Sequence, residues 1–211
     1  MFDLTGRTAL VTGAGQNVGA GIARALGTAG ATVLVNDLRP GRADEIVEAL
    51  VADGVAAVAV PFDVTDRAAI DAAVAESGPI DVLVNNAGNG GAEAMLPKKF
   101  AATDPSDWLG PMEINLHGVL HCCHAVLPGM VERGHGRIIT ISSAAGTHGV
   151  GMGFVPYSGG KGGPHGLLAE PHVADDGGLL LPEAGADLLV VERPRGDGPA
   201  PRLGERPGTR T

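Results

Sequence analysis

The alternation of strand-like and helix-like segments constrains the fold of this chain more than any other feature of its sequence. Short runs rich in β-branched residues predict strands over 8–11, 32–35, 56–60, 81–84 and 137–141. Apolar residues at helical spacing predict helices over 18–26, 43–52, 67–75 and 106–133, the last interrupted near Pro111. Because each crossover helix returns the chain to the same edge direction, this order predicts an α/β fold with a Rossmann-like, doubly wound parallel sheet.

The sequence changes character after about residue 163, where prolines stand at positions 164, 171 and 182. Proline removes a backbone donor and clashes with the preceding helical turn, so we expect no long regular helix there. A short apolar run predicts a sixth strand over 187–191. We therefore expect one nucleotide-binding domain over 1–195, regular to about residue 163 and atypical or incomplete beyond it, followed by a disordered tail over 196–211.

Composition excludes several classes of protein. A chain of 211 residues that is 44% hydrophobic is too apolar for wholesale disorder and fits one sizeable domain. Its net charge of -9 lacks the positive field that binds nucleic acid or an anionic membrane surface. The adjacent Cys122 and Cys123 oppose an ordinary disulfide, and we find neither a signal peptide nor an uninterrupted apolar run of about 18 residues. These features predict a cytoplasmic protein that binds neither membranes nor nucleic acid.

A glycine-rich segment, residues 12–19 (TGAGQNVG), lies at the turn between the first predicted strand and the first predicted helix. Glycines let the backbone approach a pyrophosphate, and the helix N-terminus offers unpaired N–H groups and the positive end of its dipole. The spacing differs from the common G-x-G-x-x-G, so a purely structural turn is the alternative interpretation.

Asp37 ends the second predicted strand about 20 residues after the glycine turn. A carboxylate at that point accepts a hydrogen bond from a ribose 2′-hydroxyl and repels a 2′-phosphate, which favours NAD over NADP. Arg39 stands two residues further on and would offset part of that repulsion. A helix or turn cap is the alternative role for Asp37.

Tyr157 and Lys161 stand four residues apart, hence on one face of the segment if it is helical. Tyrosine has an ordinary pKa near 10, so it exchanges protons poorly at neutral pH unless a nearby cation stabilises its phenolate. Tyr157 is the only tyrosine in the chain. The pair on its own could also arise by chance.

Taken together, the order and spacing of these motifs resemble those of the short-chain dehydrogenase/reductase family over about three quarters of the chain. The matching motifs are the glycine turn, Asp63-Val64, Asn85-Asn86-Ala87-Gly88, Asn115, Ser142-Ser143, and Tyr157 with Lys161.

The resemblance implies an oxidoreductase that interconverts a secondary alcohol and a ketone by hydride transfer with NAD(P), with no metal. Tyr157 would be the catalytic acid or base, and Lys161 would bind the nicotinamide ribose and lower the pKa of Tyr157. Ser143 would hydrogen-bond the reacting oxygen, and Asn115 would hold a water that relays protons to Lys161.

The same resemblance implies the cofactor-binding residues and the partners. Asp63 and Val64 would contact the adenine, and residues 86–88 would line the cofactor cleft. The full set is Gly13, Gly15, Asn17, Val18, Gly19, Asp37, Asp63, Val64, Asn86, Ala87, Gly88, Tyr157 and Lys161. The partners implied are a small-molecule alcohol or ketone and a second copy of the chain, paired through the helices that bear Asn115 and Tyr157, although prolines 164 and 171 argue against that pairing.

Two departures from the family pattern stand out. Asn17 occupies a position that is usually glycine, and asparagine tolerates left-handed backbone better than other non-glycine residues. After Gly163 neither the long helix nor the Pro-Gly strand end of the family is recognisable. We hypothesise that this region derives from a shifted reading frame or a truncated gene, which would make the chain a non-catalytic or inactive nucleotide-binding remnant. Translation of the coding DNA in its other two frames tests this idea, because one of them should encode that helix and strand.

Two further groups have ordinary structural explanations. His117, His121 and His124 would stack on one helical face, where a zinc or copper site is the less favoured alternative to plain packing. Lys98 and Lys99 form a small basic spot, which we interpret as solvated surface in preference to a contact with an anionic substrate.

Overall fold

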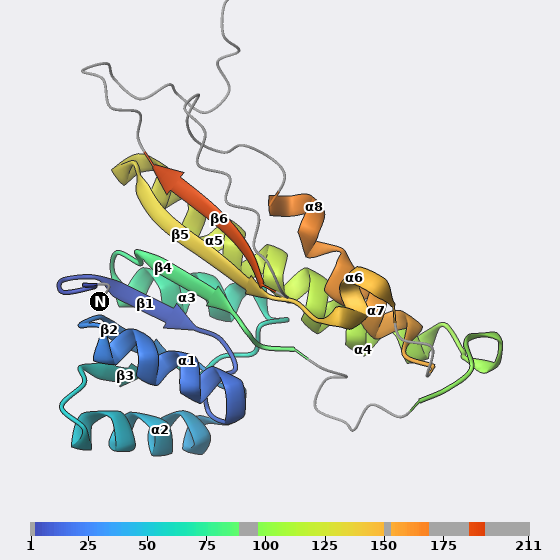
Figure 1. Ribbon diagram of the computed structural model, residues 1–211, viewed down its shortest axis with the longest axis horizontal. Coiled ribbons are helices and arrows are strands. Elements are labelled where there is room, and N and C mark those ends of the chain that lie inside the picture. Colours follow the sequence, from blue (N-terminus) through green and yellow to red (C-terminus); the bar gives the residue numbers. More distant parts are fainter. Residues whose placement is uncertain (1–2, 89–96, 150–152, 169–185, 193–211) are drawn as a thin grey trace, which may run out of the picture.

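The computed structural model describes residues 3–88, 97–149, 153–168 and 186–192, the last segment by its backbone alone. Its centre is a single sheet in the order β3-β2-β1-β4-β5-β6 (Figure 1). The strands are β1 (Thr8–Val11), β2 (Thr32–Val35), β3 (Ala57–Ala59), β4 (Val82–Asn85), β5 (His135–Ile141) and β6 (Ala186–Glu192). The first five are mutually parallel, as the sequence predicts.

Helices follow the strands in the predicted alternation. The early ones are α1 (Asn17–Thr28), α2 (Pro40–Ala52) and α3 (Arg67–Ser77). A short 3-10 turn (Phe100–Ala102) precedes the long helical segment α4 (Ser106–Met112), η2 (Glu113–His117) and α5 (Gly118–Arg133). The remaining helices are α6 (Ala144–His148), α7 (Val155–Gly162) and α8 (Pro164–Leu168).

The two faces of the sheet are covered by different helices, which is why successive strand residues are buried on both sides. One core joins Ala9, Val11 and their neighbours to α1 and α2, and the other joins Leu10 and its neighbours to α3 and α5. The chain switches face between β3 and β4, so the carboxyl ends of β1 and β4 border a crevice. Ligands of open α/β sheets bind in such a crevice.

Local sequence explains where several helices begin. Pro40 occupies the first turn of α2, where its missing N–H would have no partner in any case, so α2 starts three residues before the predicted helix. The carboxylate of Asp66 accepts a hydrogen bond from the backbone N–H of Ala69 at 3.1 Å and caps α3.

The predicted interruption near Pro111 takes the form of a π-helical segment, η2, directly after the proline-bearing α4. The combined helix Ser106–Arg133 is 28 residues long and, by length and a mean hydropathy of 1.2 over one 18-residue window, could cross a membrane. Core helices of globular proteins pass the same test, and its α5 part packs against α3, β4 and β5. Cys122 and Cys123 lie in this packed part, and burial raises the pKa values of their thiols to about 12 and about 11.

The predicted sixth strand forms and is antiparallel to β5, so the sheet departs from the parallel arrangement at this edge, in the region that the sequence predicts to be atypical. The reason is the point at which β6 begins: Ala186 pairs with Ile141, the last residue of β5, and from there the strand can only run back along its neighbour (Figure 1). Between Gly163 and β6 the described residues form the short helix α8, which starts at Pro164, since proline is tolerated in a first helical turn. Pro171, Pro182 and the predicted tail lie outside the described residues.

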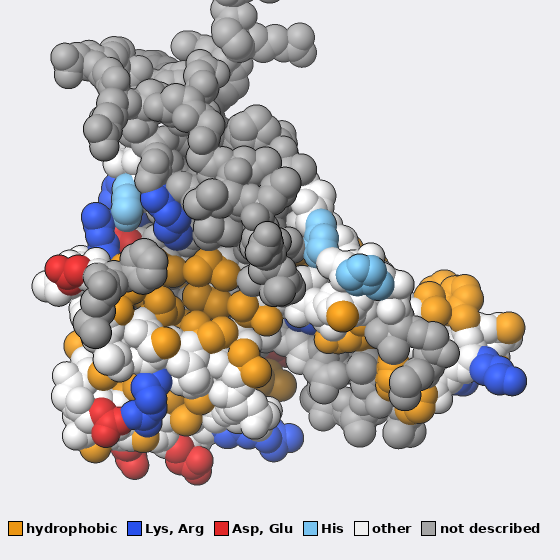
Figure 2. Space-filling view, in the orientation of Figure 1, with side chains coloured by type: hydrophobic (Ala, Val, Ile, Leu, Met, Phe, Trp, Pro, Cys, Tyr) orange, Lys and Arg blue, Asp and Glu red, His pale blue; other side chains and the backbone are white. Residues whose placement is uncertain are grey.

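On the face shown in Figure 2, Lys and Arg side chains stand in separate small groups among acidic and hydrophobic ones. No continuous basic stripe crosses the described part of that face.

Candidate functional site

The glycine turn after β1 packs closely against the segment that follows β4. Gly13 has φ +60°, and a Cβ placed there would lie 2.9 Å from the Cα of Ala87. A Cβ on Gly19 would collide with the backbone oxygen of Gly13 and lie 2.5 Å from Nδ2 of Asn86. Any side chain at either position would therefore push apart the turn and the segment after β4.

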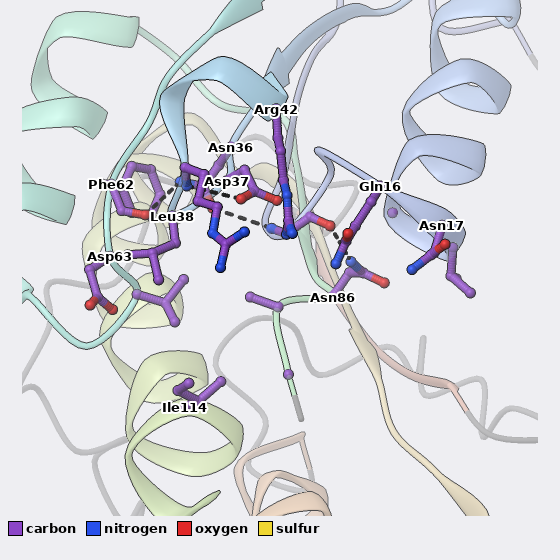
Figure 3. Close-up of a pocket in the computed structure, with 17 residues that line it drawn as sticks. Gln16, Asn17, Asn36, Asp37, Leu38, Arg42, Phe62, Asp63, Asn86 and Ile114 are labelled. Atoms are coloured by element: carbon purple, nitrogen blue, oxygen red, sulfur yellow. Dashed lines mark hydrogen bonds between the residues drawn. The ribbon is translucent and has the colours of Figure 1, made fainter. Parts of the chain in front are cut away.

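Asn17, the residue that replaces the usual glycine, does adopt left-handed backbone, with φ +48°. It is the one non-glycine residue in the described chain with positive φ. Its side chain is exposed and lies at the rim of the cleft beside Gln16 (Figure 3).

The turn borders a cleft of about 500 Å³ at the carboxyl ends of the strands (Figure 3). Its lining contains Gly13, Gln16, Asn17, Val18, Gly19, Asn36, Asp37, Leu38, Arg39, Arg42, Phe62, Asp63, Val64, Asn86, Ala87, Gly88 and Ile114. Ten of the thirteen predicted cofactor-binding residues are in this lining, while Gly15, Tyr157 and Lys161 are not. A Cβ on Gly15 would lie 2.6 Å from Oδ2 of Asp37, so that glycine makes room for the carboxylate.

The segment after β4 is clamped onto the glycine turn. Nδ2 of Asn86 donates to the backbone oxygens of Thr12 and Gly13, at 2.9 and 3.0 Å. The hydroxyl of Thr12 accepts the backbone N–H groups of Asn86 and Ala87, both at 3.1 Å. These bonds hold the glycine turn and the segment after β4 together at the carboxyl ends of β1 and β4.

Asp37 supplies a carboxylate to the cleft. Only 5% of the residue is exposed, and Oδ1 accepts the backbone N–H of Arg39 at 3.0 Å. Oδ2 is the oxygen that Gly15 accommodates. Arg39 and Arg42 also line the cleft, so two guanidinium groups border the same end of it.

Lys161 lies beside Gly88, outside the cleft lining, and is 6% exposed. Its Nζ donates to the backbone oxygen of Ile141, at the end of β5, at 2.8 Å. Burial lowers the pKa of the Lys161 ammonium to about 8. A Cβ on Gly88 would lie 2.6 Å from Nζ of Lys161 and 2.8 Å from Oδ1 of Asn115, so the last residue of the clamped segment touches both polar groups.

Asn115 is fully buried in the π-helical segment η2. Its Nδ2 donates to the backbone oxygen of Pro111 at 2.8 Å, which leaves Oδ1 directed at Gly88. The helix irregularity after Pro111 and the placement of the Asn115 side chain are thus parts of one local structure.

Ser143 and Tyr157 come from elements that pack on one another. Oγ of Ser143 accepts the backbone N–H of Ala145 at 3.2 Å and caps α6, and α6 packs against α7. Tyr157 is half-buried on α7, one turn before Lys161, so the segment is helical as the predicted pairing requires. Their catalytic roles stay predictions.

Several cleft residues were not among the predicted ones: Gln16, Asn36, Leu38, Arg39, Arg42, Phe62 and Ile114. Most flank a predicted residue in the sequence, and that adjacency is the signal that could have found them. Ile114 precedes the predicted Asn115 in the long helix, whereas Arg42 reaches the cleft from α2 and no motif marks it.

The three histidines of the long helix do not converge. Nδ1 of His117 pairs with Oε1 of Glu113 at 3.0 Å, and Nδ1 of His124 contacts Nη2 of Arg67 at 2.8 Å. Within the described ranges no group of three His, Cys, Asp or Glu side chains is arranged to hold a metal ion. Lys98 is paired with Asp107 at 2.5 Å, and Lys99 is exposed.

Comparison with known proteins gives consistent matches. The family model of short chain dehydrogenases matches residues 7–173. The 5-keto-D-gluconate 5-reductase of Escherichia coli (strain K12) is 38% identical over 166 residues, which are 77% of this chain and 63% of that protein.

Solved structures agree. A gluconate 5-dehydrogenase from Burkholderia cenocepacia in complex with NADP and tartrate is 37% identical with a TM-score of 0.72, covering 79% of this chain and 65% of its own. A 7α-hydroxysteroid dehydrogenase complexed with NADH and 7-oxo glycochenodeoxycholic acid is 33% identical with a TM-score of 0.71, covering 79% of this chain and 64% of its own. The chain spans less than two thirds of the length of these relatives.

Proposed function

Because this chain belongs to the short-chain dehydrogenase/reductase family, we propose that it interconverts a secondary alcohol and a ketone with a nicotinamide cofactor. The observation that carries the proposal is the continuity of the site. A cleft lined by the glycine turn and Asp37 extends to Gly88, and Gly88 contacts the buried Lys161 and Asn115.

The residues of the cleft fit a dinucleotide. Gly13 and Gly19 let the turn pack closely at the start of α1, where the side chain of the N-cap residue Gln16 makes no capping hydrogen bond. A helix N-terminus of this kind can bind a pyrophosphate. The Asp37 carboxylate fits a ribose 2′-hydroxyl and would repel a 2′-phosphate, so NAD is the proposed cofactor. Arg39 and Arg42 reduce this preference, and relatives are known in complex with NADP and with NADH.

Tyr157 acts in this proposal as the acid that protonates a carbonyl oxygen, or as the base that deprotonates a hydroxyl. The ammonium of Lys161, one helical turn away, stabilises the phenolate and so lowers the pKa of Tyr157 toward neutrality. Since burial lowers the pKa of Lys161 itself to about 8, the ammonium predominates at pH 7. The bond from Nζ to Ile141 keeps the cation at the end of β5.

Ser143 holds the reacting oxygen by a hydrogen bond, and Asn115 orders a water that exchanges protons with Lys161. A bound nicotinamide supplies or accepts the hydride. The protein's contribution is therefore orientation and proton transfer, which need no metal ion.

The substrate in this proposal is a small alcohol or ketone, and the chain acts in the cytoplasm without a nucleic-acid or membrane partner. The family's assembly into dimers or tetramers extends to this chain only if the helices that bear Asn115 and Tyr157, the long helical segment and α7, pair with those of a second copy.

The second candidate is a protein that binds the nucleotide but does not turn substrate over. The antiparallel β6 and the short α8 favour it, because they stand where the sequence pattern of the family would continue with a long helix and parallel strands. This candidate requires an intact cleft and an incomplete substrate pocket.

One set of measurements separates the candidates. NAD binding is followed by calorimetry, and NADH formation is followed by absorbance with a panel of secondary alcohols. Binding with turnover that Tyr157→Phe abolishes supports the enzyme, and Val58→Ala, an exposed change on the edge strand β3, serves as the unaffected control. Binding without turnover supports the second candidate, and absence of binding refutes both.

A further inference from the structure

Asn36 is a buried side chain at the cleft for which neither the family pattern nor the proposed mechanism assigns a role. It follows β2 directly and is 1% exposed. Every hydrogen-bonding group of its side chain is engaged by backbone (Figure 3).

The contacts of Asn36 reach in two directions. Toward β1, its Oδ1 accepts the N–H of Gly13 at 3.3 Å, and its backbone oxygen accepts the N–H of Ala14 at 2.6 Å. Toward β3, its Nδ2 donates to the backbone oxygens of Val60 and Phe62, at 3.1 and 3.0 Å.

These partners belong to opposite walls of the cleft. Gly13 belongs to the glycine turn, whereas Phe62 leads into Asp63 and Val64, which line the other wall. The strands that deliver the walls, β1 and β3, are not neighbours in the sheet, since β2 lies between them. No ladder hydrogen bond can therefore join the two strand ends directly, and Asn36 stands at the end of the strand between them.

We propose that Asn36 is a positioning residue that holds the glycine turn and the segment Phe62, Asp63 and Val64, here called the adenine wall, at a fixed separation. The proposal rests on the proposed function, because it takes the cleft to bind an adenine nucleotide. Only a side-chain amide offers one acceptor for Gly13 and two donors for the carbonyls of Val60 and Phe62. A ligand that spans both walls gains from their preset spacing, whereas a ligand that contacts one wall does not.

The test compares ADP, which spans both walls, with adenosine, which reaches the adenine wall alone, by calorimetry on the full chain. In Asn36→Ala the ratio of ADP affinity to adenosine affinity should fall about tenfold. Asn36→Asp keeps the size and the acceptor for Gly13 but loses both donors, so the ratio should fall there as well. Asp81→Asn is the matched control. Asp81 is 9% exposed and accepts the N–H of Thr8 at 3.0 Å, at the amino-terminal ends of β1 and β4 and so at the other end of the strands from the cleft.

The control should lower the melting temperature without changing the affinity ratio. If the Asn36 variants behave as the control does, or lose affinity for both ligands by the same factor, Asn36 is a structural residue only and the inference is overturned. If the unmodified protein binds neither ligand, it is the proposed nucleotide site that fails.

Amide hydrogen exchange of the unmodified protein tests the same contact should both Asn36 variants fail to fold. Exchange at Gly13 should be about as slow as at Ala14, because a buried side chain holds the Gly13 N–H. Fast exchange at Gly13 alone would mean that the turn is not held by Asn36.

Discussion

Replacing Asn17 by glycine should stabilise the protein, and replacing it by alanine should destabilise it. Asn17 sits at φ +48° at the start of α1, and left-handed backbone costs a residue with a Cβ roughly 1 kcal/mol. Glycine removes that cost, but its greater conformational freedom stabilises the unfolded chain and offsets about half of the gain. We therefore expect a net gain of about 0.5 kcal/mol for glycine.

Alanine keeps the Cβ and loses the local hydrogen bonding that lets asparagine tolerate this region, so it should cost about 1 kcal/mol. The two variants should thus differ by roughly 1.5 kcal/mol, or about 3–6 °C in melting temperature for a chain of this size. Urea unfolding without cofactor is the appropriate assay, since ligand binding would mask the difference.

At position 21 glycine and alanine should have the opposite order of stability. That glycine lies inside α1, has ordinary backbone and would leave its Cβ free of any contact within 4 Å. There alanine should be the more stable residue by about 1 kcal/mol. If alanine is also preferred at position 17, the backbone strain inferred at Asn17 does not exist.

Three further outcomes are expected. Burial lowers the pKa of Lys161 from 10.5 to about 8, so the unfolded chain binds the Lys161 proton more tightly, and the Lys161 contribution to stability should rise between those pH values by on the order of 3 kcal/mol. The difference in urea-unfolding free energy between the unmodified protein and Lys161→Met should show this rise, because the raised thiol pKa values of Cys122 and Cys123 lower the stability of both proteins equally above pH 9. Gly88→Ala should reduce turnover about 100-fold by displacing Lys161, while Gly21→Ala leaves it unchanged; equal rates would disprove the contact. Cys122 and Cys123, whose thiol pKa values are raised, should resist Ellman's reagent in the native protein and react fully in denaturant, and rapid native labelling would contradict their burial.

The sequence sufficed to predict the five parallel strands and most of the cleft, because each depends on local patterns. The β-branched runs give the strands, and the glycine turn and Asp37 lie directly after two of them. Topology then brings these strand ends together without further information. The left-handed Asn17 was likewise anticipated from its residue type.

What could not be predicted depends on contacts that sequence spacing does not encode. Arg42 enters the cleft because α2 begins at Pro40 and packs back on the sheet, and Ile114 enters through the π-helical segment. The direction of β6 depends on where the preceding chain delivers it, and a short apolar run carries no such information. In the sequence Asn36 is indistinguishable from any other polar residue after a strand. Its role depends on contacts with Gly13 after β1 and Phe62 after β3, which only the structure shows.

The hydrogen bond between Lys161 and the backbone of Ile141 cannot be detected by side-chain mutagenesis of residue 141. The acceptor is a main-chain carbonyl, so every replacement of residue 141 retains it. In a mutational scan, substitutions at position 141 would therefore report only the effect of side-chain packing. They would not reveal that the backbone of this residue holds the Lys161 ammonium. A chemical change confined to the main chain, such as replacing the amide that follows residue 141 by an ester, would weaken that acceptor and reveal what substitution cannot.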